Sequence, residues 1–362
     1  MPPRKIAVVL FNLGGPDKPA SVRPFLVNLF GDPAILRVPF FVRPLLARVI
    51  AALRQKAASA NYALLGGKSP LLELTQAQAQ ALEGTLQRTL PGSRCFVAMR
   101  YWHPFSLETA RVVRDWDPEE VVLVPLYPQY STTTTGSSLT AWREAAAQAG
   151  LMKPTTTLCC YHSDPGYVAA AAAGVRLAYD QARAALPGGV GLRVLFSAHG
   201  LPEAIVKAGD PYQFQVERTV AGVVRSMGLE GLDWVTCYQS RATPQKWIDP
   251  STDSEIERAA RDRVAVLVVP IAFVSEHSET LVELDIEYRE LAEKAGVPAY
   301  FRVPAQNSDP GFIAALAELV EAALGRGPGL CSFVGGRSCP RPYRDCPHAR
   351  EGALPALAEG VA

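Results

Sequence analysis

An internal repeat constrains the fold of this chain more than any other feature of its 362 residues. The run SDPGYVAA from Ser163 matches SDPGFIAA from Ser308, and VPLYPQYS from Val124 matches VPIAFVSE from Val269, both at a separation of 145 residues. A third match, VLFN with VLFS, has a separation of 185 residues. Because self-similarity at a fixed separation indicates a duplicated unit, we expect two similar domains, the first enlarged by about 40 residues.

Short apolar runs bounded by Gly, Pro or Ser recur along the chain, each followed by a longer stretch with helical periodicity. This alternation predicts an α/β fold with parallel sheets covered by helices on both faces. We expect a first domain at 1–150, a second at 151–325 and a cysteine-rich extension at 326–362. The expected strands are Ile6–Phe11, Cys95–Tyr101, Val121–Leu126, Thr156–Tyr161, Leu192–Phe196, Trp234–Tyr238, Val264–Ile271 and Ala299–Val303.

Composition excludes several classes of protein. Lys and Arg number 36 against 35 Asp and Glu, so the net charge of +1 offers no field that would attract nucleic acid. The chain has no long uncharged apolar run and no signal-peptide pattern, and its seven cysteines are therefore expected to be reduced thiols. These features argue against secreted, membrane-spanning and disordered classes.

The extra residues of the first domain map to an insertion at 35–70. Its run from Ile35 to Arg54 mixes large apolar side chains with four arginines. Such a mixture suits a membrane surface or the lip of an apolar cleft. A buried amphipathic helix whose arginines face water is the alternative.

The strongest candidate for chemistry is the acidic run after the most apolar strand, where α/β sheets place their ligands. Glu279, Glu283 and Glu287 recur every four residues and would form one stripe on a helix, with His277 at its start. Carboxylates beside an imidazole suit a cation path or a proton relay. A solvated acidic surface is the alternative.

His199 is the second candidate, because it stands between a strand and a Gly-Leu-Pro turn. A histidine there points into the crevice between domains, where a base of near-neutral pKa is useful. A structural histidine bonded to a loop carbonyl is the alternative. The sequence has no Gly-x-Ser-x-Gly, Gly-x-Gly-x-x-Gly or Walker motif, so a nucleophilic serine and a nucleotide cofactor are not supported.

Aromatic residues with interspersed Arg and Ser follow several predicted strands and the insertion. Together they suit a large, flat, partly anionic ligand, with rings against its faces and Arg100 and Ser69 towards its carboxylates. These clusters lie at Tyr62–Pro70, Arg100–Pro104, Tyr127–Ser131 and Tyr238–Trp247.

The C-terminal extension has a separate signal. It contains Cys331, Cys339 and Cys346 in a Gly/Pro/Arg-rich stretch. Three thiols in such a segment indicate metal ligation, with a fourth ligand from the Cys159–Cys160 pair. Only one residue of that pair should reach the site, because adjacent residues on a strand face opposite ways. Zinc held with His348, or an unused tail, are the alternatives.

These motifs resemble the ferrochelatase family in order and spacing over about residues 5–325. They are Asn12–Pro16, Gly66–Pro70, Arg100–Tyr101, Tyr127–Ser131, Ser197–Pro202, Gln239–Ser240 with Trp247, and Ser275–Tyr288. The resemblance implies two Rossmann-like domains with a tetrapyrrole between them, and insertion of ferrous iron into protoporphyrin IX as the last step of haem synthesis.

The resemblance also implies roles for individual residues. His199, with Glu279 beside it, would lie over the ring centre, and Glu283 and Glu287 would continue as a path for protons or iron near His277. The residues expected to bind the macrocycle are Leu13, Tyr62, Ser69, Arg100, Tyr101, Tyr130, Ser131 and Trp247. The insertion corresponds to an apolar lip, which favours contact with the inner membrane by a cytoplasmic enzyme.

Some ferrochelatases hold a 2Fe-2S cluster with three C-terminal cysteines and one internal cysteine, and this tail is similar to theirs. The animal enzymes place the internal ligand where this chain has Thr132. We therefore expect Cys160, or alternatively Cys159, as the fourth ligand, ahead of Cys95 and Cys237.

Two other functions remain open at this point. A coproporphyrin ferrochelatase shares the His and Glu pattern, although the apolar lip favours a less polar porphyrin. A non-catalytic haem- or metal-binding redox sensor is the second, and intact His199 and Glu279 argue against it. Iron is the substrate metal of either ferrochelatase, whether it acts on protoporphyrin or on coproporphyrin. The sequence is compatible with a homodimer but does not determine the oligomeric state.

Overall fold

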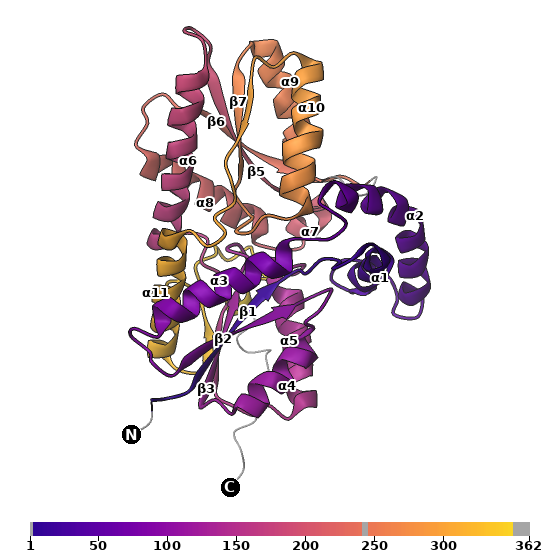
Figure 1. The fold of residues 1–362 in the computed structure, drawn as a ribbon, viewed down its shortest axis with the longest axis vertical. Helices are drawn as coiled ribbons and strands as arrows, with labels where there is room; N and C mark the ends of the chain where they lie inside the picture. Colours follow the sequence, from indigo (N-terminus) through magenta and orange to yellow (C-terminus); the bar gives the residue numbers. More distant parts are fainter. Residues whose placement is uncertain (1–2, 241–244, 350–362) are drawn as a thin grey trace.

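The computed structural model describes residues 3–240 and 245–349. Its strands form two parallel sheets, which confirms the α/β fold class (Figure 1). The first sheet has the order β2-β1-β3-β4-β9 and the second has the order β6-β5-β7-β8. The strands are β1 (Ile6–Asn12), β2 (Ser93–Met99), β3 (Glu120–Pro125), β4 (Thr155–Leu158), β5 (Leu192–His199), β6 (Asp233–Gln239), β7 (Ala265–Pro270), β8 (Tyr300–Arg302) and β9 (Gly329–Cys331).

Helices follow nearly every strand. They are α1 (Val22–Gly31), α2 (Arg43–Leu64), α3 (Leu71–Leu86), α4 (Ser106–Trp116), α5 (Thr135–Ala149), α6 (Pro165–Ala185), α7 (Glu203–Lys207), α8 (Tyr212–Met227), α9 (Thr252–Asp262), a π-helix (Glu279–Glu287), α10 (Tyr288–Ala295), α11 (Pro310–Arg326) and short 3-10 helices at Pro19–Ser21 and Pro347–Ala349.

Side chains that alternate along each central strand build two cores per sheet. In β1, Val8 and Leu10 pack with α3 and α11, whereas Val9 and Phe11 pack with α4 and α5. In the second sheet the same alternation divides β5 between α6 and α8 on one face and α9 and α10 on the other. A strand buried on both faces must be apolar throughout, which explains the continuous runs seen in the sequence.

The structure confirms the repeat. Asp164 and Asp309, 145 residues apart, each accept a hydrogen bond from the backbone three residues on and so cap α6 and α11. The two helices pack at their amino ends through equivalent positions. A Cβ added to Gly166 would lie 3.0 Å from that of Ala315, and one added to Gly311 would lie 3.5 Å from that of Ala170. Reciprocal contacts of this kind indicate a pseudo-two-fold relation between the halves.

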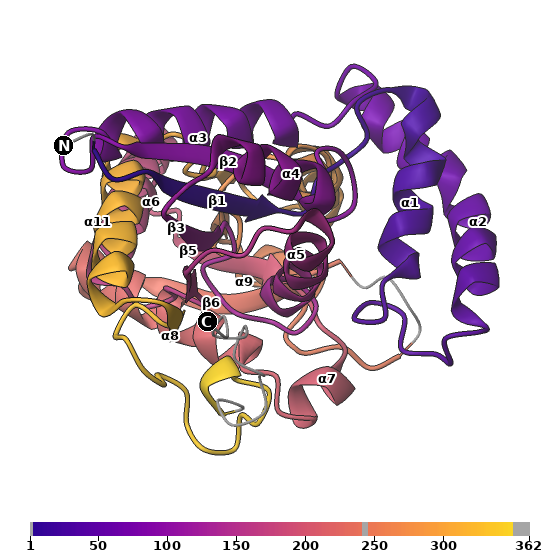
Figure 2. The same ribbon diagram turned by 90° about the horizontal axis from the view of Figure 1, so that it is seen from below.

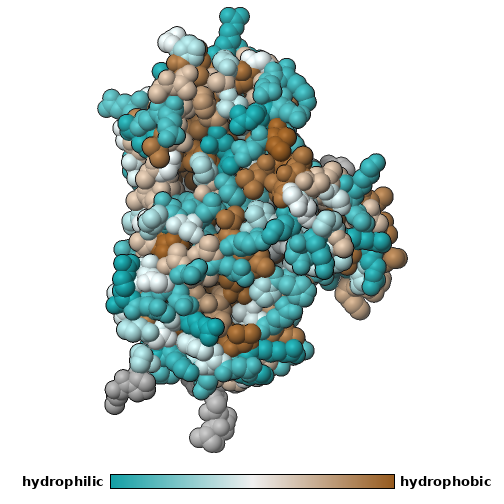
Figure 3. Space-filling view, in the orientation of Figure 1, coloured by the Kyte–Doolittle hydropathy of each residue, from teal (hydrophilic) through white to brown (hydrophobic). Residues whose placement is uncertain are grey.

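The insertion contains α2, which packs against α1, the helix that precedes it in the chain; the two helices together form a lip that stands out beside the sheets (Figure 1). Their facing sides share a small core with Tyr62 and Tyr101. The outer side of the segment exposes large apolar side chains, at Phe40, Phe41, Leu45, Val49 and Leu53. Figure 3 shows apolar surface on this projection among polar neighbours. The lip is therefore only partly buried by the rest of the chain.

The C-terminal segment differs from the expectation. β9 pairs with β4 in the first sheet, Leu158 opposite Cys331, and the remaining segment runs beside α8 (Figure 2). β4 also belongs to the first sheet, whereas a boundary at residue 150 would place it in the second domain. α11, too, packs on the first sheet. The first structural unit therefore takes strands from beyond residue 150. Residues 350–362 of the extension lie outside the described residues.

The close approach of α6 and α11 yields a stability prediction. Gly166→Leu should lower the free energy of unfolding by about 1–3 kcal/mol, because the side chain must displace Ala315. Gly174→Leu on the same helix is the matched control, since no atom lies within 4 Å of its Cβ position. It should be neutral or stabilising, by roughly 0.5–1 kcal/mol. Urea unfolding of both variants measures the difference, and equal effects would contradict the packing argument.

Candidate active site

The candidate residues gather where strands end. β5 ends at His199 and β6 at Gln239, and the π-helix begins nine residues after β7. In parallel sheets the carboxyl ends of neighbouring strands meet at one edge, where ligands bind. The sequence analysis predicted that His199 and the acidic run each follow a strand, and in the structure His199 and Glu279 are neighbours.

His199 is held so that one ring nitrogen faces an acid. Its Nδ1 lies 2.7 Å from the carbonyl oxygen of Gly200, and its Nε2 lies 3.8 Å from Oε1 of Glu279. Because a carbonyl oxygen only accepts, Nδ1 carries the hydrogen, and Nε2 of the neutral ring is free to accept a proton. The side chain of His199 is 35% exposed, so a ligand can reach it.

The acidic run folds as a π-helix, whereas the four-residue spacing had suggested an ordinary helix. Glu279, Glu283 and Glu287 still lie on one side, because the wider turn of a π-helix brings residues four apart almost into line. Glu283 is the most enclosed. One carboxylate oxygen accepts from Ser240 Oγ at 2.6 Å and Gln239 Nε2 at 3.2 Å.

The other carboxylate oxygen of Glu283 lies 3.3 Å from Tyr288 Oη. Burial, followed by the charge of Glu279, raises the pKa of Glu283 to about 7. Glu287 is exposed and accepts from Nδ2 of Asn61 on α2 at 3.5 Å. The glutamates therefore form a row that starts at His199, continues through Glu283, whose pKa is about 7, and ends at the exposed Glu287 beside the lip. Protons can move along such a row.

His277 is buried and supports this row from behind. Its Nδ1 accepts from the backbone N–H of Glu279 at 3.0 Å, and its ring packs edge-on against Phe273. Burial lowers the pKa of His277, which keeps the ring neutral. The structure thus places His277 as a support for the start of the π-helix, and its catalytic role stays a prediction.

Aromatic and apolar residues surround His199 and Glu279. The ring of Trp247 lies 6.5 Å from that of His199. Burial raises the pKa of Tyr62 to about 12, while a hydrogen bond to Ser278 opposes this shift and ties Tyr62 to the start of the π-helix. Leu13 belongs to the same small core as Tyr62. Trp247 and Tyr62 thus give the site apolar walls beside His199 and Glu279.

Other predicted ligand residues are engaged within the protein. Arg100 donates to Asp32 at 2.8 Å and to Ser137 at 2.6 Å, and the buried Tyr101 also donates to Asp32. Asp32 is a buried partner that the sequence analysis missed, because no local pattern links it to Arg100. Gln239 and Ser240, the partners of Glu283, were part of a motif in the sequence, but nothing there linked them to the acidic run.

Ser69 and Ser131 are both buried. Ser69 Oγ accepts from the backbone N–H of Leu71, and Ser131 Oγ donates to Asp210 at 3.0 Å. Tyr130 packs against Cys159 and Cys160. The loop that holds Tyr130 and Ser131 is thus fixed by groups outside the apolar walls.

The cysteines of the tail meet the two that follow β4, and Cys159, Cys160, Cys331, Cys339 and Cys346 are all buried. A hydrogen bond from Cys159, whose Sγ lies 3.7 Å away, lowers the pKa of Cys160 to about 5. One from Cys339 lowers the pKa of Cys346 to about 7. Over the described ranges, no three His, Cys, Asp or Glu side chains already surround a single metal position. Four of the five thiols form two pairs, Cys159 with Cys160 and Cys339 with Cys346.

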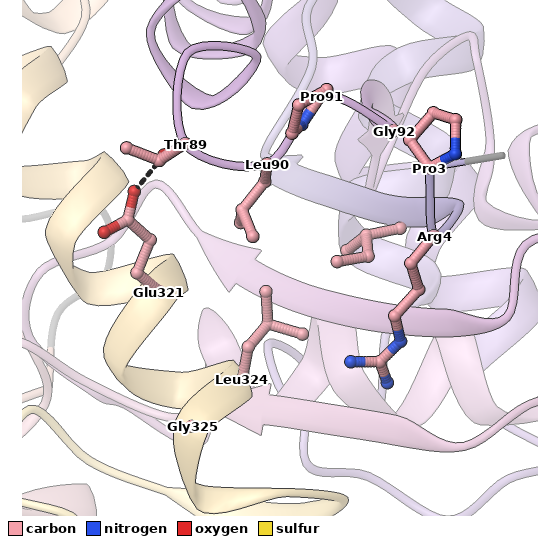
Figure 4. A pocket seen from close by; sticks show the side chains of 10 residues that line it. Pro3, Arg4, Thr89, Leu90, Pro91, Gly92, Glu321, Leu324 and Gly325 are labelled. Atoms are coloured by element: carbon pink, nitrogen blue, oxygen red, sulfur yellow. Dashed lines mark hydrogen bonds between the residues drawn. The ribbon is translucent and has the colours of Figure 1, made fainter. Parts of the chain in front are cut away.

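A cavity of about 490 Å³ lies elsewhere, between the start of β1 and the end of α11 (Figure 4). It is lined by Arg4, Leu90 and Leu324 among others, and a hydrogen bond from Thr89 to Glu321 closes one side. This is the amino end of the sheet, opposite the edge that carries His199. The cavity therefore has no part in the site.

Comparison with known proteins identifies the family of the chain. The family described as Ferrochelatase matches residues 5–324. Ferrochelatase from Caulobacter vibrioides is 51% identical over 97% of this chain and 99% of its own length, and that from Pelagibacter ubique is 46% identical over 87% and 90%. A structure of SirB from Bacillus subtilis with Fe3+ shares the fold, with a TM-score of 0.50 at 14% identity over 88% of this chain and 95% of its own. The chain belongs to the ferrochelatase family, enzymes that insert iron into a porphyrin in haem synthesis.

Proposed function

We propose that this enzyme inserts ferrous iron into protoporphyrin IX to form protohaem. The observation that carries the proposal is the orientation of His199, whose Nε2 faces Glu279 while Nδ1 is held by Gly200. A porphyrin loses two pyrrole protons when it takes up a divalent metal, so the site needs a proton acceptor beside the ring nitrogens. A neutral imidazole with a free Nε2 supplies one.

The acidic row then serves as an exit for these protons. Both oxygens of Glu283 already accept hydrogen bonds from neighbouring side chains, which leaves them poorly placed to bind a metal ion. A carboxyl with a pKa of about 7 can accept and release a proton at neutral pH. Glu279 therefore passes protons from His199 to Glu283, and Glu287 releases them to solvent.

The lip favours protoporphyrin over coproporphyrin. Its outer side exposes five large apolar side chains, which suit a poorly soluble porphyrin delivered from a membrane better than a tetracarboxylate. Arg100 is already paired with Asp32, so its guanidinium is less available to bind the additional carboxylates of coproporphyrin.

His199→Ala should abolish iron insertion while porphyrin binding is retained within about threefold, because the change removes the proton acceptor and leaves the apolar walls. Initial rates with protoporphyrin IX and coproporphyrin III, and porphyrin fluorescence quenching, test this. His103→Ala, at an exposed histidine paired with Glu108, is the control. Turnover by His199→Ala would refute the role of His199, and a preference of the wild type for coproporphyrin III would refute the substrate.

The raised pKa of Glu283 predicts a pH-dependent stability. The unfolded chain loses this proton near pH 4.5 and the folded protein near pH 7, so ionising Glu283 lowers the free energy of unfolding between these values. Glu283→Gln removes this cost. The variant should therefore gain stability relative to wild type on going from pH 5 to pH 8, by up to about 3 kcal/mol.

Urea midpoints at the two pH values measure this difference. Glu290→Gln, at an exposed glutamate on α10, is the control. A difference between Glu283→Gln and wild type that stays constant with pH would contradict the assignment.

We further propose that the cysteine site holds a 2Fe-2S cluster, with Cys331, Cys339, Cys346 and Cys160 as ligands. Such a cluster needs four thiolates, and these four thiols are all buried. Cys160 is favoured over Cys159 because it lies near enough for its charge to act on all three thiols of the tail, Cys331, Cys339 and Cys346. A bound cluster supplies a one-electron redox centre. Iron content and visible absorption of protein purified without oxygen test the proposal, and colourless, iron-free protein would refute it.

We also propose that the lip binds the surface of the inner membrane from the cytoplasm. No helix within the described residues is long and apolar enough to span a bilayer. Phe41, just before α2, is 71% exposed and Leu45 on α2 is 67% exposed, and Arg48 on α2 can meet anionic headgroups.

Phe41→Ser combined with Leu45→Ser should weaken binding to phosphatidylethanolamine–phosphatidylglycerol vesicles at least tenfold, because the protein loses two apolar side chains that enter the bilayer surface when it binds. Co-sedimentation measures the change. Leu177→Ser, at a residue 62% exposed on α6, is the control. Equal binding by all three proteins would contradict a membrane role for the lip.

A further inference from the structure

The buried side chain of Gln215, on α8, joins two parts of the molecule that have been described separately. Its Nε2 lies 3.1 Å from Sγ of Cys339, and its Oε1 lies 2.7 Å from the backbone nitrogen of Tyr130. A backbone N–H can only donate, so the amide oxygen must face Tyr130 and the NH₂ group must face the sulfur. Gln215 therefore donates to a proposed cluster ligand while it holds the loop of Tyr130.

Other residues on α8, and one just before it, also form hydrogen bonds with that loop. Thr219, one turn after Gln215, accepts from Nε2 of Gln129 at 3.0 Å. Asp210, just before α8, accepts from the side chain of Ser131 and from both the backbone and the side chain of Thr132. The loop after β3 of the first sheet is thus held by groups of the second half of the chain.

The loop also reaches the lip. Arg37 donates to Oγ1 of Thr132 at 3.2 Å, so a displacement of the loop acts on the segment that leads into the lip. On its other side Tyr130 packs against Cys159 and Cys160. The loop accordingly contacts the cysteine site, α8 and the lip at once.

We propose that Gln215 is a positioning residue that couples the cysteine site to the porphyrin pocket. This inference rests on the proposed cluster and on the proposed pocket. Ligation fixes Sγ of Cys339, which fixes the amide of Gln215, which in turn sets the loop of Tyr130. Coupling between two sites is reciprocal, so porphyrin binding must alter the cluster by the same free energy.

The hydrogen bond to sulfur makes this coupling measurable without turnover. Donors to ligand sulfurs stabilise the reduced cluster and so raise its reduction potential. The potential of the wild-type cluster should shift when protoporphyrin IX is added in the absence of free ferrous iron. Gln215→Met should lower the potential of the porphyrin-free protein, abolish the shift, and weaken protoporphyrin binding about fivefold, as expected for a lost buried hydrogen bond.

Two variants sharpen the experiment. Gln213→Met is the matched control, because Gln213 is on the same helix and donates only to Glu217 at the surface. It should behave as wild type. Gln215→Glu retains the oxygen that accepts from Tyr130 but removes the donor to Cys339. It should lower the potential and abolish the shift with little loss of porphyrin affinity, and it answers the question if Gln215→Met does not fold.

The outcomes separate the two proposals. Wild-type protein without a cluster would overturn the cofactor and the coupling together. A cluster whose potential ignores protoporphyrin, or whose potential and shift are the same in wild type and both Gln215 variants, would overturn the coupling and leave the cofactor standing. Redox titration followed by electron paramagnetic resonance, with fluorescence quenching for porphyrin affinity, supplies the measurements.

Discussion

The packing of α6 against α11 is the contact on which the rest of the molecule depends. At their amino ends the two helices approach closely because each has a glycine opposite an alanine of the other, at Gly166 with Ala315 and Gly311 with Ala170. The pair relates the halves by a pseudo-two-fold axis, so the loops after the strands of one sheet meet those of the other. Gln78 of α3, for example, donates at 2.9 Å to the backbone oxygens of Val274 and Asn307. The site arises at this meeting of loops.

The site in turn depends on how the second half accommodates three carboxylates. A nearly neutral net charge conceals a local row of glutamates that repel each other. Their repulsion is relieved in different ways along the row. Glu283 can hold a proton near neutral pH and accepts three hydrogen bonds, whereas Glu287 is exposed to water. The π-helix brings these environments into one line, and His277 fixes where that line begins.

Much of this architecture follows from local patterns, and the exceptions have physical causes. All eight predicted strands correspond to observed strands, and the clearest are β1, β3, β5 and β7, because a strand buried on both faces leaves a continuous apolar run. The π-helix was missed, since residues four apart align in it as nearly as in an α-helix. The pair of Arg100 with Asp32 was missed because it joins positions 68 residues apart without a local signal. The contact of His277 with the backbone of Glu279 was not predicted, because burial of a ring cannot be read from its neighbours in sequence.

The ninth strand shows that tertiary contacts, and not the local sequence, determine how the polar C-terminal segment folds. β9 has only three residues and no apolar pattern, so it could not be predicted alone. β4 offers an open sheet edge, and unpaired backbone groups at such an edge favour the addition of another strand. The register sets Cys331 opposite Leu158, immediately before Cys159 and Cys160, and Cys159 N–H donates to the carbonyl of Cys331. The cysteine site is therefore assembled by backbone pairing at the edge of the first sheet, and the side chains need only complete it.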